Sequence, residues 1–418
     1  MSESIPRGEG RVRMRKLVSW GLVGQISYVI SQFILLMALA RFASVEEVGR
    51  FGFASAIIIP VFFFFNLGLR VNQATDVAHR FSFNEFVYIR TIATALGCLV
   101  ILIIAFTVLD PATRLITLVF GAAKAAETFS DFFYGVFQRA ERLDYVARSL
   151  AVRGFGSAVL FTIILAGTGS TGLAFLANLA VWVVVAIFVD YLPARRIAVR
   201  DGDIGPVRKD YVRELVRSSL PLGVNQLLSG LQGNLPRYII GWMIGIAALG
   251  QFTVVSYAMQ AVMTVTNAVG QSISARLAHY VASGNRRAYM KFFHVFLLFV
   301  TVAGVAGTLL SYVIGDWLIE FVFGSNYAGL GLIFALCILA SVLRACVIIL
   351  QSGLFAFRDF HLNMILRCFS IGLMFAACLI GAWSGGLIGL CWGMILTFFV
   401  HSVALWAALQ RKQFIAPD

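Results

Sequence analysis

The sequence predicts an all-α, polytopic membrane protein with twelve transmembrane helices in two six-helix lobes that form a parallel repeat. The first observation is a series of twelve long apolar stretches, since about 20 apolar residues are needed to cross the roughly 30 Å hydrocarbon layer. The second is composition: 60% of the 418 residues are hydrophobic and 13% are charged. The mean hydropathy of +0.88 lies far outside the range of soluble domains. The third is a one-sided distribution of basic residues.

The predicted spans occupy each long apolar run in turn. The first run follows a basic head and is too long for the apolar core of a signal peptide, so we expect an uncleaved span. The spans of the first half are 17–40, 51–69, 87–109, 115–137, 149–168 and 172–192. Those of the second half are 217–243, 248–270, 292–314, 327–350, 364–382 and 386–409.

Basic residues set the orientation, because Lys and Arg near span ends stay on the cytoplasmic side. Most of the 33 basic residues fall on the face that holds both termini, whereas Arg41, Arg50 and Arg114 fall on the other. Arg70 and Arg153 are counted here with the cytoplasmic set. Both termini are therefore predicted to be cytoplasmic. The net charge of +13 is explained by this topology, so we expect no nucleic-acid partner.

A polar segment divides the chain into two halves. We predict an N-terminal lobe at 1–192, a cytoplasmic linker at 193–216 and a C-terminal lobe at 217–418. At an offset of 201 residues, four positions are identical between the halves: Gln25 and Gln226, Gly49 and Gly250, Phe51 and Phe252, Ser55 and Ser256. Six spans per half give both lobes the same orientation, as in transporters built from parallel repeats.

Three charged residues mark the fourth predicted span. Lys124, Glu127 and Asp131 stand at i, i+3 and i+7 and so share one face of a helix. Charge at this depth is retained where it is paired or lines a water-filled cavity. One reading makes Lys124 a substrate-binding cation and the two carboxylates an ion-coupling site. The other is an internal Lys124–Glu127 salt bridge that neutralises the helix.

Further polar residues point to the same kind of cavity. Arg237 in the seventh span and Arg344 in the tenth are candidate substrate-binding cations, although each could also reach a span end and place its charge at the interface. Gln25 and Gln226 lie on polar faces of the first and seventh spans, and an amide there needs protein or water as a neighbour. Hydrogen bonds between helices would also explain both glutamines.

Proline and glycine punctuate several spans. Pro221 and Pro236 flank the seventh span, where they either shape packing or form a hinge between the lobes. Gly385, Gly389 and Gly393 recur every four residues, which predicts a close-packing helix face.

Neither the six cysteines nor the five histidines form a metal-ligand spacing, so no metal and no cofactor is predicted.

Three segments resemble a known family. These are LARFASVEEVGRFGFASAI after the first span, KAAETFSDFFYGVFQRAERLDYVARS in and after the fourth, and SSLPLGVNQLLSGLQGNLPRYIIGWMIG in the seventh, with LGQF after it. They are similar to polysaccharide transporters, and more narrowly to O-antigen or exopolysaccharide flippases of the Wzx type. That group belongs to the superfamily that includes multidrug and toxin extruders.

The resemblance implies two six-helix lobes around a central cavity and transport without chemistry, so the protein is not expected to be an enzyme. It implies movement of an undecaprenyl-diphosphate-linked oligosaccharide across a bacterial inner membrane by alternating access, coupled to H⁺ or Na⁺. Membrane lipids, a polysaccharide polymerase and other assembly proteins are the implied partners.

Two alternatives stay open. A multidrug extruder of the same fold is disfavoured because the first span holds no carboxylate. A membrane-embedded glycosyltransferase or polymerase needs a large outer loop, and the longest, near 315–326, has only Asp316 and Glu320 as acids.

Overall fold

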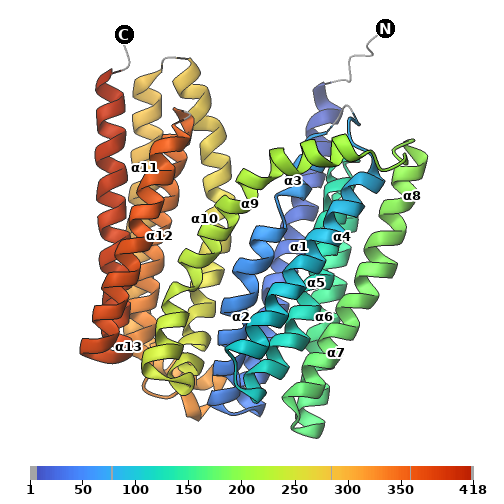
Figure 1. The fold of residues 1–418 in the computed structure, drawn as a ribbon. Coiled ribbons are helices and arrows are strands. Elements are labelled where there is room, and N and C mark those ends of the chain that lie inside the picture. The colour runs from blue at the N-terminus through green and yellow to red at the C-terminus, as the bar shows by residue number, and fades with distance from the viewer. Residues whose placement is uncertain (1–6, 77–78, 284, 358, 416–418) are drawn as a thin grey trace. The chain divides into compact units, whose positions relative to one another are not determined.

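The computed structural model describes residues 7–76, 79–283, 285–357 and 359–415, and every regular element in those ranges is a helix (Figure 1). The N-terminal helices are α1 (Arg7–Phe42), α2 (Val45–Phe65), α3 (Leu69–Thr75), α4 (Phe83–Thr107), α5 (Pro111–Arg139), α6 (Leu143–Thr168), α7 (Thr171–Val184), the π-helical η1 (Val185–Tyr191) and α8 (Leu192–Arg200). There follow α9 (Lys209–Ile239), the π-helical η2 (Ile240–Ile244), α10 (Ile246–Ala282), α11 (Arg286–Phe323), the 3₁₀ turn η3 (Ser325–Tyr327), α12 (Gly331–Ala356) and α13 (Phe360–Ile415).

The predicted membrane class is confirmed, while the number of spans stays a prediction. Within the described residues, 8 helices are long and apolar enough to cross a membrane. The long helices α5, α9 and α10 are not among these 8, and α13 contributes a single stretch, His361–Arg411. The two ends of the chain, whose side we predicted, lie outside the described residues.

The chain forms two compact units, Met1–Asn234 and Leu235–Asp418, which are described separately below as the N-terminal and C-terminal units. The division falls inside α9 rather than in the polar segment at 193–216. That segment contains most of α8 and the first turns of α9. The predicted lobe boundaries at 192 and 217 stay a prediction.

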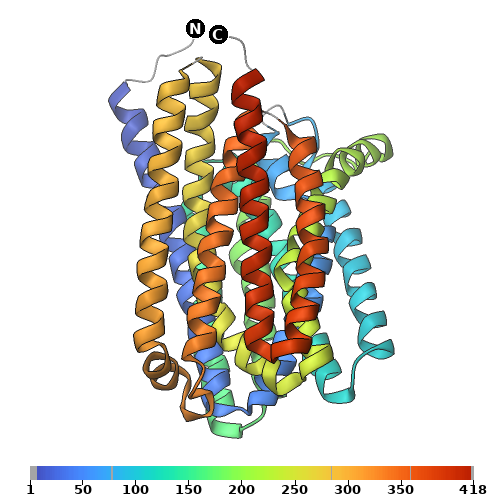
Figure 2. The same cartoon turned by 90° about the vertical axis from the view of Figure 1, so that its left-hand side faces the viewer.

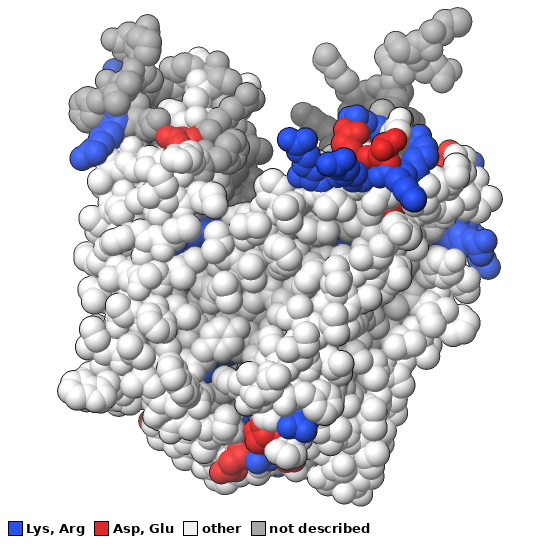
Figure 3. Space-filling view, viewed as in Figure 1, with Lys and Arg blue, Asp and Glu red and all other residues white. Residues whose placement is uncertain are grey.

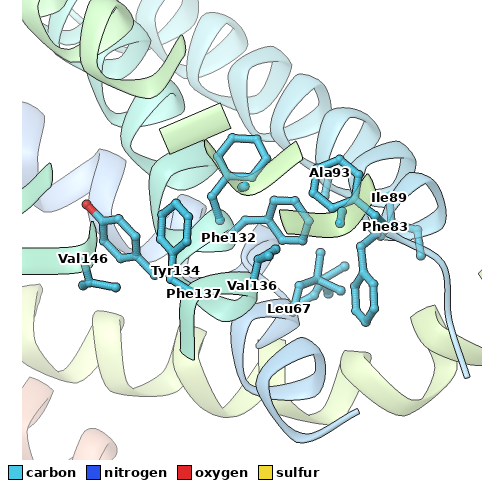
Figure 4. Packing of buried hydrophobic residues seen from close by; sticks show 14 of the residues in the cluster. Leu67, Phe83, Ile89, Ala93, Phe132, Tyr134, Val136, Phe137 and Val146 are labelled. Carbon is cyan, nitrogen blue, oxygen red and sulfur yellow. The ribbon is translucent and has the colours of Figure 1, made fainter. Parts of the chain in front are cut away.

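An aromatic core holds the N-terminal unit together (Figure 4). Phe132, Phe133 and Phe137 of α5 are buried, and Phe132 and Phe133 pack against Phe83 at the start of α4. Leu67, just before α3, and Val146 on α6 belong to the same cluster. Between helices in lipid, such packing replaces the hydrophobic effect as the main attraction. This core fixes the position of α5, whose polar face forms the site described below.

Local signals in the sequence set where these helices begin. Ser44 and Ser82 each form a capping box with the glutamate three residues later, Glu47 and Glu85. Asp110 caps α5, and Pro111 follows at the first helical position, where its missing N–H is not needed. The three caps hold the starts of α2, α4 and α5.

The first part of α9 packs within the N-terminal unit. Asn72 of α3 donates a hydrogen bond to the Ser219 hydroxyl at 2.7 Å, and Arg80 pairs with Glu214 at 2.5 Å. Further along, Gly230 lies against Pro60 of α2, at a distance that leaves little space for a side chain. Residues 209–234 are therefore part of this unit.

In the C-terminal unit, α13 is a hairpin (Figure 2). Gly385 and Gly386 have non-helical backbone angles, and Gly386 has a φ of +56°, which favours glycine. Gly389 lies against the backbone of Gly381, and Gly393 against that of Ala377. Gly389 and Gly393 thus pack closely as predicted, whereas Gly385 lies in the turn.

Charged side chains gather at the helix ends, and the flanks between them are mostly uncharged (Figure 3). One mixed cluster lies at the cytoplasmic end of the N-terminal unit by our predicted orientation. There, Asp203 pairs with Arg139 and with His79, and Arg208 pairs with Glu85 at 2.8 Å. These pairs attach the segment after α8 to the ends of α4 and α5.

Candidate functional site

A polar cavity of about 460 Å³ lies within the N-terminal unit. Its walls come from α1, α2, α3, α5, α6 and α9, together with Asn66, which follows α2. The lining residues are Gly21, Gln25, Tyr28, Ile59, Phe62, Phe63, Asn66, Arg70, Lys124, Glu127, Thr128, Asp131, Tyr134, Gln138, Leu143, Val146, Leu150, Arg153 and Gln226. The volume falls within the range of small-molecule sites, roughly 300–1,000 Å³.

Glu127 lies at the centre of the first charged group in this cavity. Its carboxylate accepts from Lys124 Nζ at 2.5 Å and from the Tyr28 hydroxyl at 2.7 Å. Arg153 Nη2 lies 3.4 Å from the same carboxylate, and the Arg153 side chain is only 2% exposed. The guanidinium also lies over the rings of Tyr28 and Trp182, at 5.0 and 5.3 Å from their centroids. One carboxylate is therefore shared by two cations.

A second charged group is closer to solvent. Arg70 Nη1 pairs with Asp131 at 2.7 Å, and Arg70 Nε donates to the Gln138 side chain at 3.2 Å. Both members of the pair are about one third exposed. Arg70 also lies over the ring of Tyr134, at 5.3 Å. Since solvent screens this pair, it is more easily exchanged for another partner than the buried group around Glu127.

Helical spacing explains how these residues meet. Lys124, Glu127, Asp131, Tyr134 and Gln138 recur every three or four residues and form one face of α5. On the facing side, α1 and α6 approach closely because Gly24 lies against Ala147 and Gly154 against Ser31. This close contact brings Tyr28 and Arg153 to the same oxygen of the Glu127 carboxylate, Oε1, while Lys124 contacts the other oxygen.

Five of the seven predicted site residues line this cavity: Gln25, Lys124, Glu127, Asp131 and Gln226. The Lys124–Glu127 salt bridge, one of the two readings of the sequence, is present. The cavity reading is compatible with it, because both side chains of the pair also line the cavity. That they bind substrate or a coupling ion stays a prediction.

The other two predicted residues belong to the C-terminal unit. Arg237 is 5% exposed and donates through Nη2 to the Ser256 hydroxyl at 2.9 Å. Arg344 lies over the ring of Phe398, at 5.9 Å from its centroid. Neither residue is among those that line the cavity of the N-terminal unit.

Sequence reasoning missed two cations of the cavity. Arg70 and Arg153 were assigned to the cytoplasmic basic set, although Arg153 falls five residues inside the predicted span 149–168. The sequence did contain a signal for Arg153. It shares one helix face with three residues that also line the cavity, Leu143, Val146 and Leu150, at spacings of i, i+3, i+7 and i+10.

Comparison with solved structures defines the class of fold. The chain is similar to an inward-facing multidrug resistance MATE transporter of the MOP superfamily, with a TM-score of 0.73 and 15% identity over 95% of this chain and 100% of the other. It is similar to the lipid II flippase MurJ in an inward closed conformation, with a TM-score of 0.68 and 11% identity over 94% and 87% of the two chains. The Vibrio cholerae MATE transporter VcmN gives a TM-score of 0.66 and 15% identity over 96% of each chain. The protein is thus an integral membrane protein with a MATE- and MurJ-like helical fold.

Sequence comparison then gives the family. Residues 14–272, more than half of the chain, match the family described as polysaccharide biosynthesis protein. The chain is also 22% identical to the capsular polysaccharide biosynthesis protein CapF of Staphylococcus aureus, over 75% of this chain and 78% of CapF. The protein belongs to the polysaccharide biosynthesis protein family, which confirms the resemblance to polysaccharide transporters.

Proposed function

We propose that the protein is a flippase that moves an undecaprenyl-diphosphate-linked oligosaccharide from the cytoplasmic to the periplasmic leaflet during O-antigen, lipopolysaccharide or exopolysaccharide synthesis. The family and the fold support a transporter of polysaccharide biosynthesis. The observation that carries the proposal furthest is the charge of the cavity in the N-terminal unit.

That cavity has a positive surplus. Three cations, Arg70, Lys124 and Arg153, face two carboxylates, Glu127 and Asp131, which leaves one positive charge. A diphosphate or acidic sugar needs compensating charge once it leaves the headgroup layer, because an unpaired anion in a low-dielectric space is strongly disfavoured. Arginine offers a planar fork that fits phosphate or carboxylate, whereas lysine acts as a point charge.

Further residues complete the proposed binding region. We assign Gln25 and Gln226 to hydrogen bonding with polar groups of the substrate, because both side chains line the cavity. Arg237 and Arg344 are proposed to add positive charge from the C-terminal unit at another stage of transport. Glu127 and Asp131 are proposed to respond to the coupling ion, H⁺ or Na⁺.

Alternating access requires a flexible point between the two units. The units divide between Asn234 and Leu235, immediately before Pro236. Proline removes a backbone hydrogen bond and commonly bends a helix. We therefore propose that α9 bends near Pro236 during transport, which makes this proline the hinge rather than a feature of packing alone.

The proposed location is the bacterial inner membrane, with both termini in the cytoplasm and a polysaccharide polymerase and other assembly proteins as partners on the pathway. Reporter fusions test the orientation. Fusions after Gly169 and Asn326 are expected to report the periplasm, and those after Arg200 and Arg287 the cytoplasm. A periplasmic signal at Arg200 would overturn the twelve-span arrangement.

Reconstitution into liposomes tests the flippase proposal. A fluorescent undecaprenyl-diphosphate-linked oligosaccharide is placed in both leaflets, and a membrane-impermeant quencher reports the outer fraction with time. We expect quenching to proceed beyond the outer-leaflet fraction in proteoliposomes and to stop there in protein-free vesicles. Equal traces from the two kinds of vesicle would refute the proposal.

A multidrug extruder is the second candidate, and the similarity to MATE transporters favours it. Such a protein would bind organic cations, for which the positive surplus of the cavity is unfavourable. Accumulation of a fluorescent organic cation in the same vesicles, without movement of the lipid-linked substrate, would establish this alternative. An enzyme activity such as glycosyl transfer has no such supporting observation, so we propose a transporter and not an enzyme.

A further inference from the structure

One buried acid lies outside the cavity and has no role in the proposed binding of substrate. Asp190 belongs to the π-helical segment η1, between α7 and α8, and it is 0% exposed. Neither oxygen of its carboxyl group has a hydrogen-bond partner in the described part of the chain. An ionised carboxylate without partners at this depth is strongly disfavoured. A neutral, protonated carboxylic acid is the form that this environment favours.

The surroundings of Asp190 are polar without supplying a counterion in direct contact. The hydroxyls of Ser130 on α5 and Ser149 on α6 lie beside the carboxyl group but outside hydrogen-bonding geometry. Ser149 is instead bonded to the Tyr134 hydroxyl at 2.8 Å. A carboxylic acid can donate a proton to one of these hydroxyl oxygens, which an ionised carboxylate cannot.

Charged groups on the neighbouring elements are few. From α6, Arg153 interacts with Asp190 electrostatically over a longer distance. From α5, Glu127 and Asp131 are already paired with cations, and Tyr134 interacts with Asp190 electrostatically. The helix α7 has no charged residue, and the arginines of α8, Arg195, Arg196 and Arg200, are exposed.

Arg153 connects this acid to the cavity. Its Nη2 pairs with Glu127, while Nε and Nη1 are buried without hydrogen-bond partners in the described residues. The same guanidinium is therefore within electrostatic range of two carboxyl groups and has donors available for a second one. Glu127 would keep Lys124 and Tyr28 if Arg153 turned away from it.

We propose that Asp190 is the proton-binding group of the N-terminal unit and that Arg153 links its protonation to the cavity. With the proton bound, Asp190 is neutral and Arg153 pairs with Glu127. When the proton leaves to water, the Asp190 carboxylate attracts the guanidinium, and one cation is withdrawn from the cavity wall. This inference rests on the proposed ion-coupled transport and names its coupling ion as H⁺, which Asp190 binds and to which Glu127 responds through Arg153.

Infrared difference spectroscopy of the purified protein tests the proton site without any transport measurement. At mildly acidic pH, the wild type is expected to show the carbonyl stretching band of a protonated carboxyl group. Asp190→Asn should remove that band, while Glu127→Gln and Asp131→Asn should retain it because those two carboxylates are paired with cations. Ser149→Ala, which changes a neighbour of the acid, should shift the band and so assigns it even if Asp190→Asn does not fold.

Three spectroscopic results would overturn the inference. The first is the absence of the band from the wild type, and the second is a band that survives in Asp190→Asn. Loss of the band on adding Na⁺ at constant pH would also overturn it, because the acid would then be a sodium ligand.

A transport measurement distinguishes failure of this inference from failure of the proposed function. In proteoliposomes with a pH gradient, the stimulation of flipping by the gradient should disappear in Asp190→Asn and persist in Ser219→Ala, a change outside η1 and the cavity. Unchanged stimulation in Asp190→Asn would contradict the inference. Failure of the wild type to flip the substrate at all would count against the flippase proposal, while the infrared band would still report the proton site.

Discussion

The candidate substrate-binding cations have different partners in the two units. In the cavity of the N-terminal unit, arginine and lysine side chains meet carboxylates, as in the pairs of Glu127 with Lys124 and Arg153. In the C-terminal unit, Arg237 donates to a serine hydroxyl and Arg344 lies over an aromatic ring. The acidic residues of that unit are only Asp316, Glu320, Asp359 and Asp418.

This difference has a consequence for an arriving anion. In the cavity of the N-terminal unit, the substrate must compete with a carboxylate for each cation. Binding of the substrate therefore changes which cations Glu127 is paired with. In the C-terminal unit, a hydroxyl or a ring holds the arginine more weakly than a carboxylate would. We therefore expect changes in the N-terminal unit to alter stability and transport together, and changes in the C-terminal unit to alter transport more than stability.

The largest effect is expected for Arg153→Met. Removing one member of a buried ion pair costs roughly 3–5 kcal/mol, and the lower end applies because Glu127 keeps Lys124 and Tyr28. Flipping should fall at least about tenfold, since a fork-shaped donor is also lost. Thermal unfolding and the liposome assay measure the two effects. Arg195→Met on the exposed face of α8 is the matched control, and equal behaviour of the two variants would contradict the account.

The second-largest effect is expected for substitutions of Arg237. Arg237→Lys keeps the charge but not the planar fork, so transport should fall several-fold, and Arg237→Ala should lower it further. Unfolding temperature should change less than in Arg153→Met, because the Ser256 hydroxyl to which Arg237 donates carries no charge. If Arg237→Ala destabilises the protein more than Arg153→Met does, the proposed contrast between the units is wrong.

A double-mutant cycle at Lys124 and Glu127 should give an intermediate effect. Both side chains are about 20% exposed, so solvent screens the pair only in part. We expect a coupling energy of about 1–2 kcal/mol, within the range found for contacting residues. Lys124→Met combined with Glu127→Gln should therefore be more stable than the sum of the single changes predicts. Additive unfolding energies would show that the pair contributes nothing.

The smallest effect is expected for the Arg70–Asp131 pair. Both side chains are about one third exposed, and exposed pairs contribute roughly 0–1 kcal/mol. Asp131→Asn should shift stability by less than about 1 kcal/mol, and raising the salt concentration should reduce the shift further. If Asp131→Asn lowers stability as much as Arg153→Met does, this pair is buried in the membrane-embedded protein.

Part of the site could be predicted because helical periodicity depends only on sequence. The spacing of Lys124, Glu127 and Asp131 placed them on one face of a helix, and the structure has them together in the cavity. The partners from other helices could not be found in this way. Glu127 of α5 contacts Tyr28 of α1 and Arg153 of α6, two helices that approach each other closely at two glycines, and such an approach depends on packing in three dimensions.

The ends of the spans were the weakest part of the prediction. Asp190 falls near the end of the predicted span 172–192, where a charge is ordinarily at the interface. The structure continues from α7 through η1 into α8, so this residue is buried within a longer helical stretch. The boundary between lobes at 193–216 stays a prediction, and the structure adds that the first part of α9 packs on α2 and α3. Hydropathy alone does not report which neighbour a polar helix end contacts.

Binding of the lipid-linked substrate to the purified protein tests the central claim most directly, namely that the cations of the N-terminal cavity hold the anionic part of the substrate. The dissociation constant for undecaprenyl-diphosphate-linked oligosaccharide is measured for the wild type, Lys124→Met with Arg153→Met, and the control Arg195→Met. We predict that the double variant binds at least about tenfold more weakly, a loss of roughly 1.4 kcal/mol, and that the control binds as the wild type does. Equal affinity in all three proteins, with each of them folded, would contradict the account.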